Sequence, residues 1–455
     1  MPRSGLNASA GGSLPPAITR DPHPGLVRRV LHGLYDCMWL LAAVLGSPWL
    51  LWRSHTRPGF GAIVLDRLGR GVGKVPRRGQ KQRVMVHGVS VGEVKGALPI
   101  VREIERTRPD LEVVISTSTE TGREVARVVF PDHIVVNFPV DLTFVVRRFL
   151  RRVDPSAVVL VELEIWPNFL RIANRMGVPV AVVNGRITAD SFRSYRWFKG
   201  LLPQFNRISL FCAQGREYAQ RFLQLHVEPE RVIETGNVKA DGLSIGRVTP
   251  SSELMRLLGP TEGQLVFVAG STHPGEEHLL LAAAAKVLPG WRVIVVPRHP
   301  KRASDLSTEL KAAGLAVQRL TAMRSGEAPD PSLPAMVDTI GELEGVYGLA
   351  DLAFVGGSLI PRGGQNMLEP AAQGVAVLTG PFLDNFTQEA RFLQSAGALE
   401  ILEQPCDLEA SLARLGADEA LRRKMGVAGM AATRAQQGAA RKTVEALQQT
   451  CLPGR

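Results

Sequence analysis

Residues 351–381 read DLAFVGGSLIPRGGQNMLEPAAQGVAVLTGP. The apolar run 352–355 predicts a buried parallel strand, and the two glycines after it permit a sharp turn. Asn366 is a favoured N-cap for a short helix, which a second apolar run follows. A loop of this kind offers free N–H groups and a positive helix end to a phosphate, and Glu369 could accept hydrogen bonds from a ribose. Because glycine-rich strand-to-helix turns also serve ordinary packing, these residues leave nucleotide binding and packing both open.

The composition narrows the class of protein. A chain of 455 residues is long enough for two domains of ordinary size. Its formal net charge of +11 implies an anionic partner, which could be a nucleic acid, a membrane surface or a phosphorylated substrate. The four cysteines are scattered, with no CxxC or Cys/His spacing, so neither a disulfide framework nor a zinc site is indicated.

The N-terminal part predicts a membrane anchor. Residues 1–24 are rich in Gly, Ser, Pro and Ala and are expected to form a mobile tail. Residues 25–52 are expected to form an apolar helix, close to the ~20 residues that cross a bilayer and interrupted by His32 and Asp36. Residues 53–83 carry nine Lys or Arg side chains and one acid, which places the rest of the chain in the cytoplasm and against anionic lipid. The alternative is a buried helix followed by a solvated basic linker.

Beyond this segment, short apolar strands alternate with helices, which predicts an α/β fold with two Rossmann-like domains. The first domain is expected over 53–241. The second is expected over 254–455 and contains the glycine-rich loop described above. A segment with Gly, Pro and Ser over 242–253 is expected to link them.

Three glutamates stand at the predicted ends of buried strands in the first domain. Glu93 follows a strand and a glycine turn, where it could act as general base on an attacking hydroxyl or close a capping box with Ser90. Glu162 and Glu164 end another strand, where two carboxylates are costly unless they are paired or functional. Glu164 is expected nearer the cleft edge, and Glu162 is expected to be capping or structural. Lys239 falls where the first domain passes to the second.

Basic side chains stand at the corresponding place in the second domain. Arg298 and His299 follow the strand predicted over 292–296, and further cations come directly after them. Clustered cations beside a glycine loop suit the phosphate of a nucleotide. The mixture of aromatic and basic residues over 192–198 could favour nucleic acid. Much of the positive charge, however, collects beside the apolar N-terminal segment, so no nucleic-acid partner is expected.

Seven short motifs, taken in order, resemble the bacterial 3-deoxy-D-manno-octulosonic acid (Kdo) transferase family. The resemblance runs from about residue 52 to the end of the chain, and the order of seven motifs is far more specific than any one of them. The motifs are HGVSVGE at 87–93, ELEIWPN at 162–168, GNVK at 236–239, GSTHPGEE at 270–277, PRHP at 297–300, GEL at 341–343 and GQNMLEP at 364–370.

The resemblance implies a fold, an activity and a location. The fold would be the GT-B glycosyltransferase architecture, with two Rossmann-like domains facing a cleft and an N-terminal membrane-anchor helix. The activity would be inverting transfer of Kdo from CMP-Kdo to the lipid A precursor lipid IVA in lipopolysaccharide biosynthesis, without a metal or another cofactor. The protein would lie at the cytoplasmic face of the cell inner membrane, in contact with anionic lipid. A GT-B sugar-nucleotide epimerase is the alternative enzyme, and a membrane-tethered scaffold is the alternative without catalysis.

The resemblance also assigns roles to particular residues. Glu93 would be the general base on the acceptor hydroxyl. Glu164 and Lys239 would orient the substrates or stabilise charge in the transition state. The residues that would bind CMP-Kdo are Arg298, His299, Ile340, Gly341, Glu342, Asn366, Met367, Leu368 and Glu369.

Overall fold

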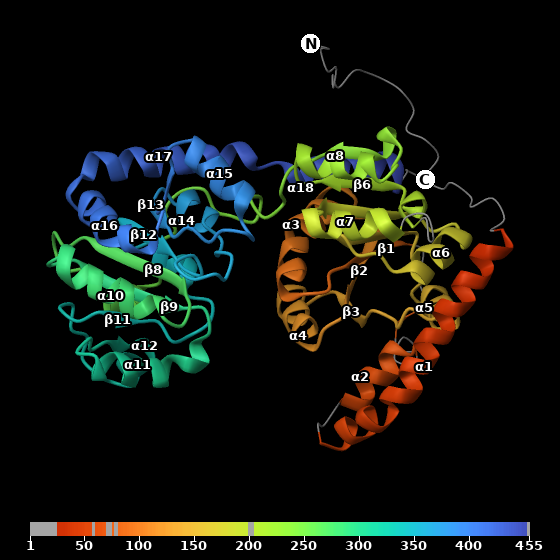
Figure 1. Ribbon diagram of the computed structural model, residues 1–455, viewed down its shortest axis with the longest axis horizontal. Helices are drawn as coiled ribbons and strands as arrows, with labels where there is room; N and C mark the ends of the chain where they lie inside the picture. The colour runs from red at the N-terminus through yellow and green to blue at the C-terminus, as the bar shows by residue number, and fades with distance from the viewer. Residues whose placement is uncertain (1–24, 57–59, 70–74, 77–80, 199–203, 453–455) are drawn as a thin grey trace, which may run out of the picture. The chain divides into compact units, whose positions relative to one another are not determined.

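The computed structural model describes residues 25–56, 60–69, 75–76, 81–198 and 204–452 (Figure 1). The predicted tail over 1–24 lies outside the described residues, and so do five of the nine basic residues predicted over 53–83. The chain divides into two compact units. The first consists of residues 1–242 and 437–455, and the second of residues 243–436.

The first unit is built on a parallel sheet of seven strands in the order β3-β2-β1-β4-β5-β6-β7. Alternate side chains of the central strands enter two separate apolar clusters, so both faces of the sheet are covered. This is the expected arrangement for near-continuous apolar strands in a parallel sheet. The strands are β1 (Gln82–His87), β2 (Leu111–Thr117), β3 (Ile134–Asn137), β4 (Ala157–Val161), β5 (Val180–Gly185), β6 (Leu210–Ala213) and β7 (Val232–Glu234). The helices that follow these strands are α3 (Val91–Thr107), α4 (Glu120–Val129), α5 (Thr143–Val153), α6 (Pro167–Arg175), α7 (Ala189–Phe198) and α8 (Arg216–Gln224).

The last helix, α18 (Ala439–Thr450), belongs to the first unit, whereas the sequence analysis placed it in the second domain. Its buried side chains, among them Val444 and Leu447, join the apolar cluster on one face of the first sheet. The carboxylate of Asp241 accepts hydrogen bonds from the N–H groups of Gly438 and Ala440 at the start of this helix. The boundary between the two units near the C-terminus therefore depends on the sheet against which α18 packs. The position of this helix in the chain does not show which sheet that is.

The second unit repeats the plan with a parallel sheet in the order β10-β11-β9-β8-β12-β13-β14. The expected strand over 352–355 is β12, and the expected helix and strand after it are present. The strands are β8 (Val266–Thr272), β9 (Arg292–Pro297), β10 (Gln318–Arg319), β11 (Ala335–Met336), β12 (Leu352–Val355), β13 (Ala376–Thr379) and β14 (Leu399–Ile401). The helices are α9 (Ser252–Leu258), α10 (Glu276–Val287), α11 (Ala303–Ala312), α12 (Leu320–Arg324), α13 (Leu343–Tyr347), α14 (Leu368–Ala372), α15 (Thr387–Ser395), α16 (Leu408–Ala417) and α17 (Glu419–Gln436).

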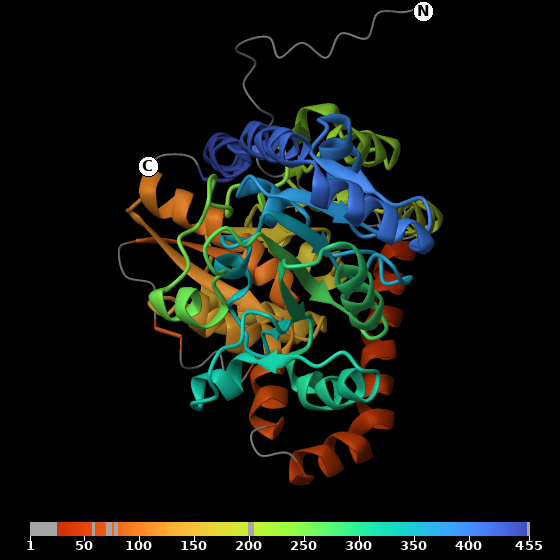
Figure 2. The ribbon, with the colours of Figure 1, turned by 90° about the vertical axis from the view of Figure 1, so that its left-hand side faces the viewer.

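Two helices precede the first sheet. The long helix α1 (Leu26–Thr56) runs past the predicted boundary at 52, and α2 (Phe60–Arg67) contacts it (Figures 1 and 2, red). Within the described residues, α1 is the one helix long and apolar enough to cross a membrane by length and composition, over Arg29–Thr56 with a mean hydropathy of 1.4.

The two sides of α1 differ. Exposed apolar side chains recur every three or four residues along one side, which is the repeat of a single helix face. They include Leu34, Met38, Leu41, Leu45, Trp49 and Trp52. On the other side, Asp36 accepts hydrogen bonds from Thr143 and Asn168, and the hydroxyl of Tyr35 donates to Asp141. The helix is therefore fastened to the first unit by polar contacts and presents an apolar stripe away from it.

Candidate active site

The candidate site residues of the first unit gather at the carboxyl ends of two neighbouring strands. Strands β1 and β4 pair directly, with His87 opposite Leu160 near their ends. Glu93 lies in the first turn of α3, directly after β1, and Glu162 and Glu164 follow β4. The topology thus brings together the three glutamates that the sequence analysis placed at strand ends.

Glu93 closes a cap at the start of α3, as one of the two predictions for this residue proposed. Its Oε2 accepts the N–H of Val89 at 2.7 Å and its Oε1 accepts the hydroxyl of Ser90 at 2.8 Å. The carboxyl group is half-buried, and burial raises its pKa, helped by the negative charge of Glu162. Each carboxylate oxygen has a second lone pair, so the cap leaves acceptor capacity for a substrate proton. The capping geometry and the predicted base role are compatible.

The carboxyl group of Glu164 is also perturbed by its surroundings. Burial raises its pKa to about 7, and the nearby charges of Glu93 and Glu162 act in the same direction. Near neutral pH this group is therefore partly protonated and can donate as well as accept a hydrogen bond. Within the part of the chain that the structure describes, no group of three or more His, Cys, Asp or Glu side chains is placed to hold a metal ion.

Lys239 pairs with Glu162, the carboxylate that the sequence analysis treated as capping or structural. Its Nζ lies 3.5 Å from Oε1 of Glu162, and about 30% of each side chain is exposed. Glu162 has a φ of +63°, so the chain leaves β4 in the left-handed region. Asn184, buried near the end of β5, holds the lysine loop by accepting the N–H of Val238 at 3.2 Å. The lysine is thereby brought to the ends of β4 and β5.

A buried glutamate that the sequence analysis did not single out organises the glycine-rich loop of the second unit. The carboxylate of Glu276 accepts four backbone N–H groups at 2.7–2.9 Å. Three of these donors are Gly357, Ser358 and Leu359, directly after β12. A Cβ on Gly356 would lie 2.6 Å from the backbone of the neighbouring strand end, so this close approach requires glycine. Nothing in the local pattern around Glu276 reveals donors more than eighty residues away.

Cationic groups surround His273 at the ends of β8 and β9. The rings of His273 and His299 meet edge to face at 5.8 Å, and the amide of Gln365 lies 3.3 Å from Nε2 of His273. Burial lowers the pKa of His273, and the charges of His299, Arg362 and Arg298 lower it further, against the opposing effect of Glu276. Both predicted residues, Arg298 and His299, are exposed. These side chains together suit an anionic ligand. His273 and Arg362 are thus candidate donor-binding residues in addition to the predicted Arg298 and His299.

The segment from Asn366 to Glu369 has fewer groups available to a ligand than the sequence predicts. The amide of Asn366 donates to Glu369 at 3.1 Å and accepts the N–H of Leu368 at 3.2 Å. The side chains of Met367 and Leu368 are fully buried in the core of the unit. These two residues can therefore offer only backbone groups to a ligand, and the N–H of Leu368 already has an acceptor. Asn366 and Glu369 are the side chains of this segment that remain partly exposed.

The residues 340–342 precede α13. Ile340 is 86% exposed, and Gly341 has a φ of +95°, which favours glycine at this turn. The carboxylate of Glu342 forms an ion pair with Arg324 at 2.8 Å. Helix α13 is joined to α14, because the side-chain amide of Gln373 donates to the carbonyl of Glu344 at 2.9 Å. This contact joins the helix that follows residues 340–342 to the helix that carries Glu369. Two of the segments predicted to bind the donor are therefore linked.

Comparison with known proteins decides the family. Residues 66–242 match the family of 3-deoxy-D-manno-octulosonic-acid transferases (kdotransferases). The 3-deoxy-D-manno-octulosonic acid transferase of Bordetella pertussis is 33% identical over 93% of this chain and 98% of its own length. That of Haemophilus influenzae is 31% identical over 80% of this chain and 86% of its own length. The chain belongs to the Kdo transferase family. The predicted family and enzyme class are confirmed, and the epimerase and scaffold alternatives are set aside.

The fold of the transferase is also shared with solved structures. A glycosyltransferase from Rickettsia africae superposes with a TM-score of 0.55 over 83% of this chain and 100% of its own, at 11% sequence identity. A likeness at this identity concerns the fold alone. Together with the two parallel seven-stranded sheets, it confirms the predicted GT-B class.

Proposed function

We propose that this transferase moves Kdo from CMP-Kdo to a hydroxyl of a lipid A precursor, with inversion at the anomeric carbon and with Glu93 as the general base. The observation that carries the proposal is the carboxyl group of Glu93, which is half-buried at the end of the central strand pair with a raised pKa. A carboxylate whose pKa moves towards the working pH is a better proton acceptor than an ordinary surface glutamate.

The chemical step follows from this assignment. The acceptor oxygen attacks the anomeric carbon of Kdo while its proton passes to an oxygen of Glu93. The bond from the anomeric carbon to the phosphate oxygen breaks, and CMP leaves with the electron pair. Attack from the face opposite the leaving group inverts the anomeric centre.

Glu164 and Lys239 are proposed to position the sugars. Because the pKa of Glu164 is about 7, its protonated form can donate a hydrogen bond to a sugar oxygen near neutral pH. The ion pair with Glu162 fixes the ammonium group of Lys239, which can then hold a carboxylate or hydroxyl of the substrate. The role of Glu162 is to place this cation and to raise the pKa of Glu93.

Donor binding is proposed for the second unit. Arg298, His299 and His273 would neutralise the phosphate of CMP or the carboxylate of Kdo, which are both anions. A single phosphate carries little charge, so fixed cations suffice to stabilise it as it leaves. Glu369, oriented by Asn366, would accept hydrogen bonds from the ribose. Residues 340–342 would line the cytosine, with the exposed Ile340 side chain available to cover its ring.

The proposed location is the cytoplasmic face of the inner membrane, with α1 lying in the membrane surface. The apolar stripe of α1 offers the area that an interfacial helix buries among lipids. The hydrogen bonds of Tyr35 and Asp36 to the first unit favour this surface position over a span, because that part of α1 is held against protein.

The test is incubation of the purified full chain with CMP-Kdo and a tetra-acylated lipid A precursor. Mass spectrometry should find the lipid heavier by one or more Kdo residues, with one CMP released for each. A parallel incubation with UDP-N-acetylglucosamine should yield no epimer. Release of CMP without sugar on the lipid, or an unchanged donor, would contradict the proposal.

A further inference from the structure

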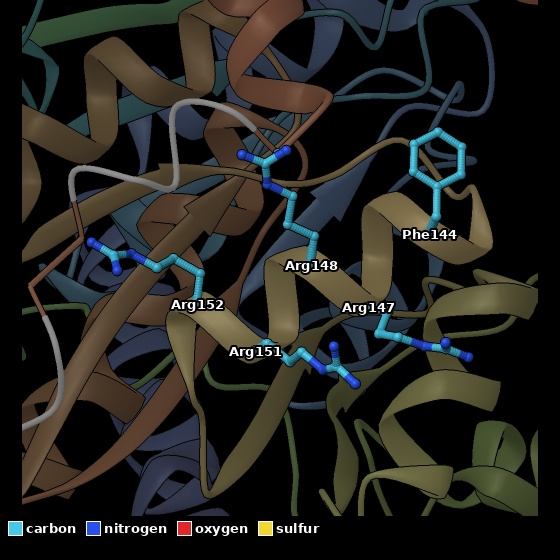
Figure 3. A pocket seen from close by; sticks show the side chains of 6 residues that line it. Phe144, Arg147, Arg148, Arg151 and Arg152 are labelled. Carbon is cyan, nitrogen blue, oxygen red and sulfur yellow. The ribbon is translucent and has the colours of Figure 1, made fainter.

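Helix α5 of the first unit carries a basic pocket that the proposed chemistry does not use. The pocket has a volume of about 530 Å³ and is shown in Figure 3. It is lined by Gly69, Phe144, Arg147, Arg148, Arg151 and Arg152. The five α5 residues stand at positions i, i+3, i+4, i+7 and i+8, so they share one face of the helix. The opposite face packs in the core, which leaves the arginine face to solvent.

Three of the four arginines in this pocket are exposed. No acidic side chain lines it. Among the residues that the structure describes, no ion pair is recorded for Arg147, Arg148 or Arg151, and all three are exposed. Guanidinium groups within two turns of one helix repel one another, and an anion between them relieves that repulsion. The planar fork of arginine matches the oxygens of a phosphate.

The walls of the pocket are attached to the two N-terminal helices. At the first residue of α5, the N–H and hydroxyl of Thr143 donate to Asp36 of α1 at 3.1 and 2.5 Å. Gly69 closes the other side, two residues after α2, and a Cβ at this position would lie 3.6 Å from Cδ of Arg148. The ring of Phe144 is 63% exposed beside the arginines. An apolar ring next to a phosphate-binding group suits a molecule with both a charged head and an apolar body.

We propose that this pocket binds the phosphate headgroup of an anionic phospholipid from the leaflet in which α1 rests. The proposal depends on the membrane attachment proposed above, and it assigns the lipid contact to the arginine face of α5 rather than to the basic side chains of residues 53–83. The arginines hold the phosphate oxygens, and Phe144 contacts the glycerol and the first part of the acyl chains. Inorganic phosphate could satisfy the arginines but would leave Phe144 in water.

The test uses the full chain in neutral detergent micelles and counts bound lipid by native mass spectrometry. Short-chain phosphatidylglycerol is titrated against phosphatidylcholine and inorganic phosphate. The variant is Arg147→Gln, Arg148→Gln and Arg151→Gln together, which keeps good helix formers on α5. The matched control is Arg102→Gln, Arg127→Gln and Arg216→Gln, which removes three exposed charges from other helices of the same unit.

Wild type and the control should bind phosphatidylglycerol in preference to phosphatidylcholine. The α5 variant should bind phosphatidylglycerol on the order of tenfold to a hundredfold more weakly. Its transfer rate with detergent-dispersed acceptor should match wild type, which separates this proposal from the proposed function. Each single arginine variant should show an intermediate loss, which keeps the test open if the triple variant does not fold.

Three results would overturn the proposal. The first is unchanged phosphatidylglycerol binding by a folded α5 variant. The second is displacement of phosphatidylglycerol by equimolar inorganic phosphate, which would make the pocket a site for free phosphate. The third is a raised KM for the lipid acceptor in the α5 variant, which would assign the pocket to the acceptor.

Discussion

The ammonium group of Lys239 lies 3.5 Å from the carboxylate of Glu162, at the end of the strand that also leads to Glu164. The family resemblance assigns this lysine a role together with Glu164. The positive φ of Glu162 changes the path of the chain directly after β4, and the alternation of a regular strand no longer applies there. As a result, one of three neighbouring carboxylates is compensated by a cation, while the pKa values of Glu93 and Glu164 stay raised.

Replacement of Glu162 by Gln should shift the pH dependence of transfer. The negative charge of Glu162 contributes to the raised pKa of Glu93, so its removal should lower that pKa. The released cation of Lys239 acts in the same direction. The acidic limb of the kcat/KM profile should therefore move to lower pH. The matched control is Glu124→Gln, an exposed change on α4, which should leave the limb in place. If the acidic limb does not move in Glu162→Gln, Glu93 is not the group whose titration sets that limb.

Replacement of Glu164 by Gln should make the protein more stable at alkaline pH. A carboxyl group whose pKa rises from 4.5 to about 7 on folding stabilises the fold while protonated, and this contribution is lost as pH rises through 7. The gain of the variant over wild type should be small at pH 4, grow towards pH 7 and then level off. After allowance for partial exposure, it should reach roughly 1–2 kcal/mol. Urea unfolding at pH 4, 6 and 8 measures it, and an equal effect at all three values would refute the assignment.

Replacement of Glu276 by Gln should weaken the second unit. The neutral amide loses charge-assisted bonds to four N–H groups and turns an N–H donor towards some of them. We expect a loss of about 2–4 kcal/mol in the free energy of unfolding, because each buried donor left unpaired is costly. Glu344→Gln, an exposed glutamate on α13, provides the control and should change stability by less than about 0.5 kcal/mol. Equal stability of the two variants would show that Glu276 does not hold the loop.

The apolar stripe of α1 should govern membrane attachment. Replacement of both Leu41 and Leu45 by Glu places two charges among lipids, and should reduce binding to inner-membrane vesicles by about tenfold or more. The control pair is Val128→Glu with Val427→Glu, two exposed apolar positions on α4 and α17. The fraction of protein that sediments with the vesicles is measured for both double variants, and the control should sediment like wild type. If the Leu41 and Leu45 variant sediments like wild type, the attachment lies elsewhere.

Much of the fold could be predicted because its signals are local. Apolar runs marked the strands on either side of the glycine-rich loop, and a serine three residues before Glu93 marked the start of α3. The order of seven motifs predicted the family, which the relatives confirm. The assigned catalytic and donor-binding roles stay predictions.

Other features depend on contacts that sequence periodicity does not encode. Glu276 looks like an ordinary glutamate in a first helical turn, yet its partners lie beyond β12. The placement of α18 in the first unit depends on which sheet covers its apolar face. The burial of Met367 and Leu368, which removes their side chains from the proposed donor site, likewise follows from the core around them.

The most direct measurement is single-turnover transfer by Glu93→Gln, combined with donor binding by calorimetry. Gln can keep the hydrogen bond from Val89 that caps α3, but it cannot take up the acceptor proton. Transfer should slow by about 10²- to 10⁴-fold, while the Kd for CMP-Kdo should stay within about twofold of wild type. Transfer by Glu93→Gln at the wild-type rate would show that Glu93 is not the general base.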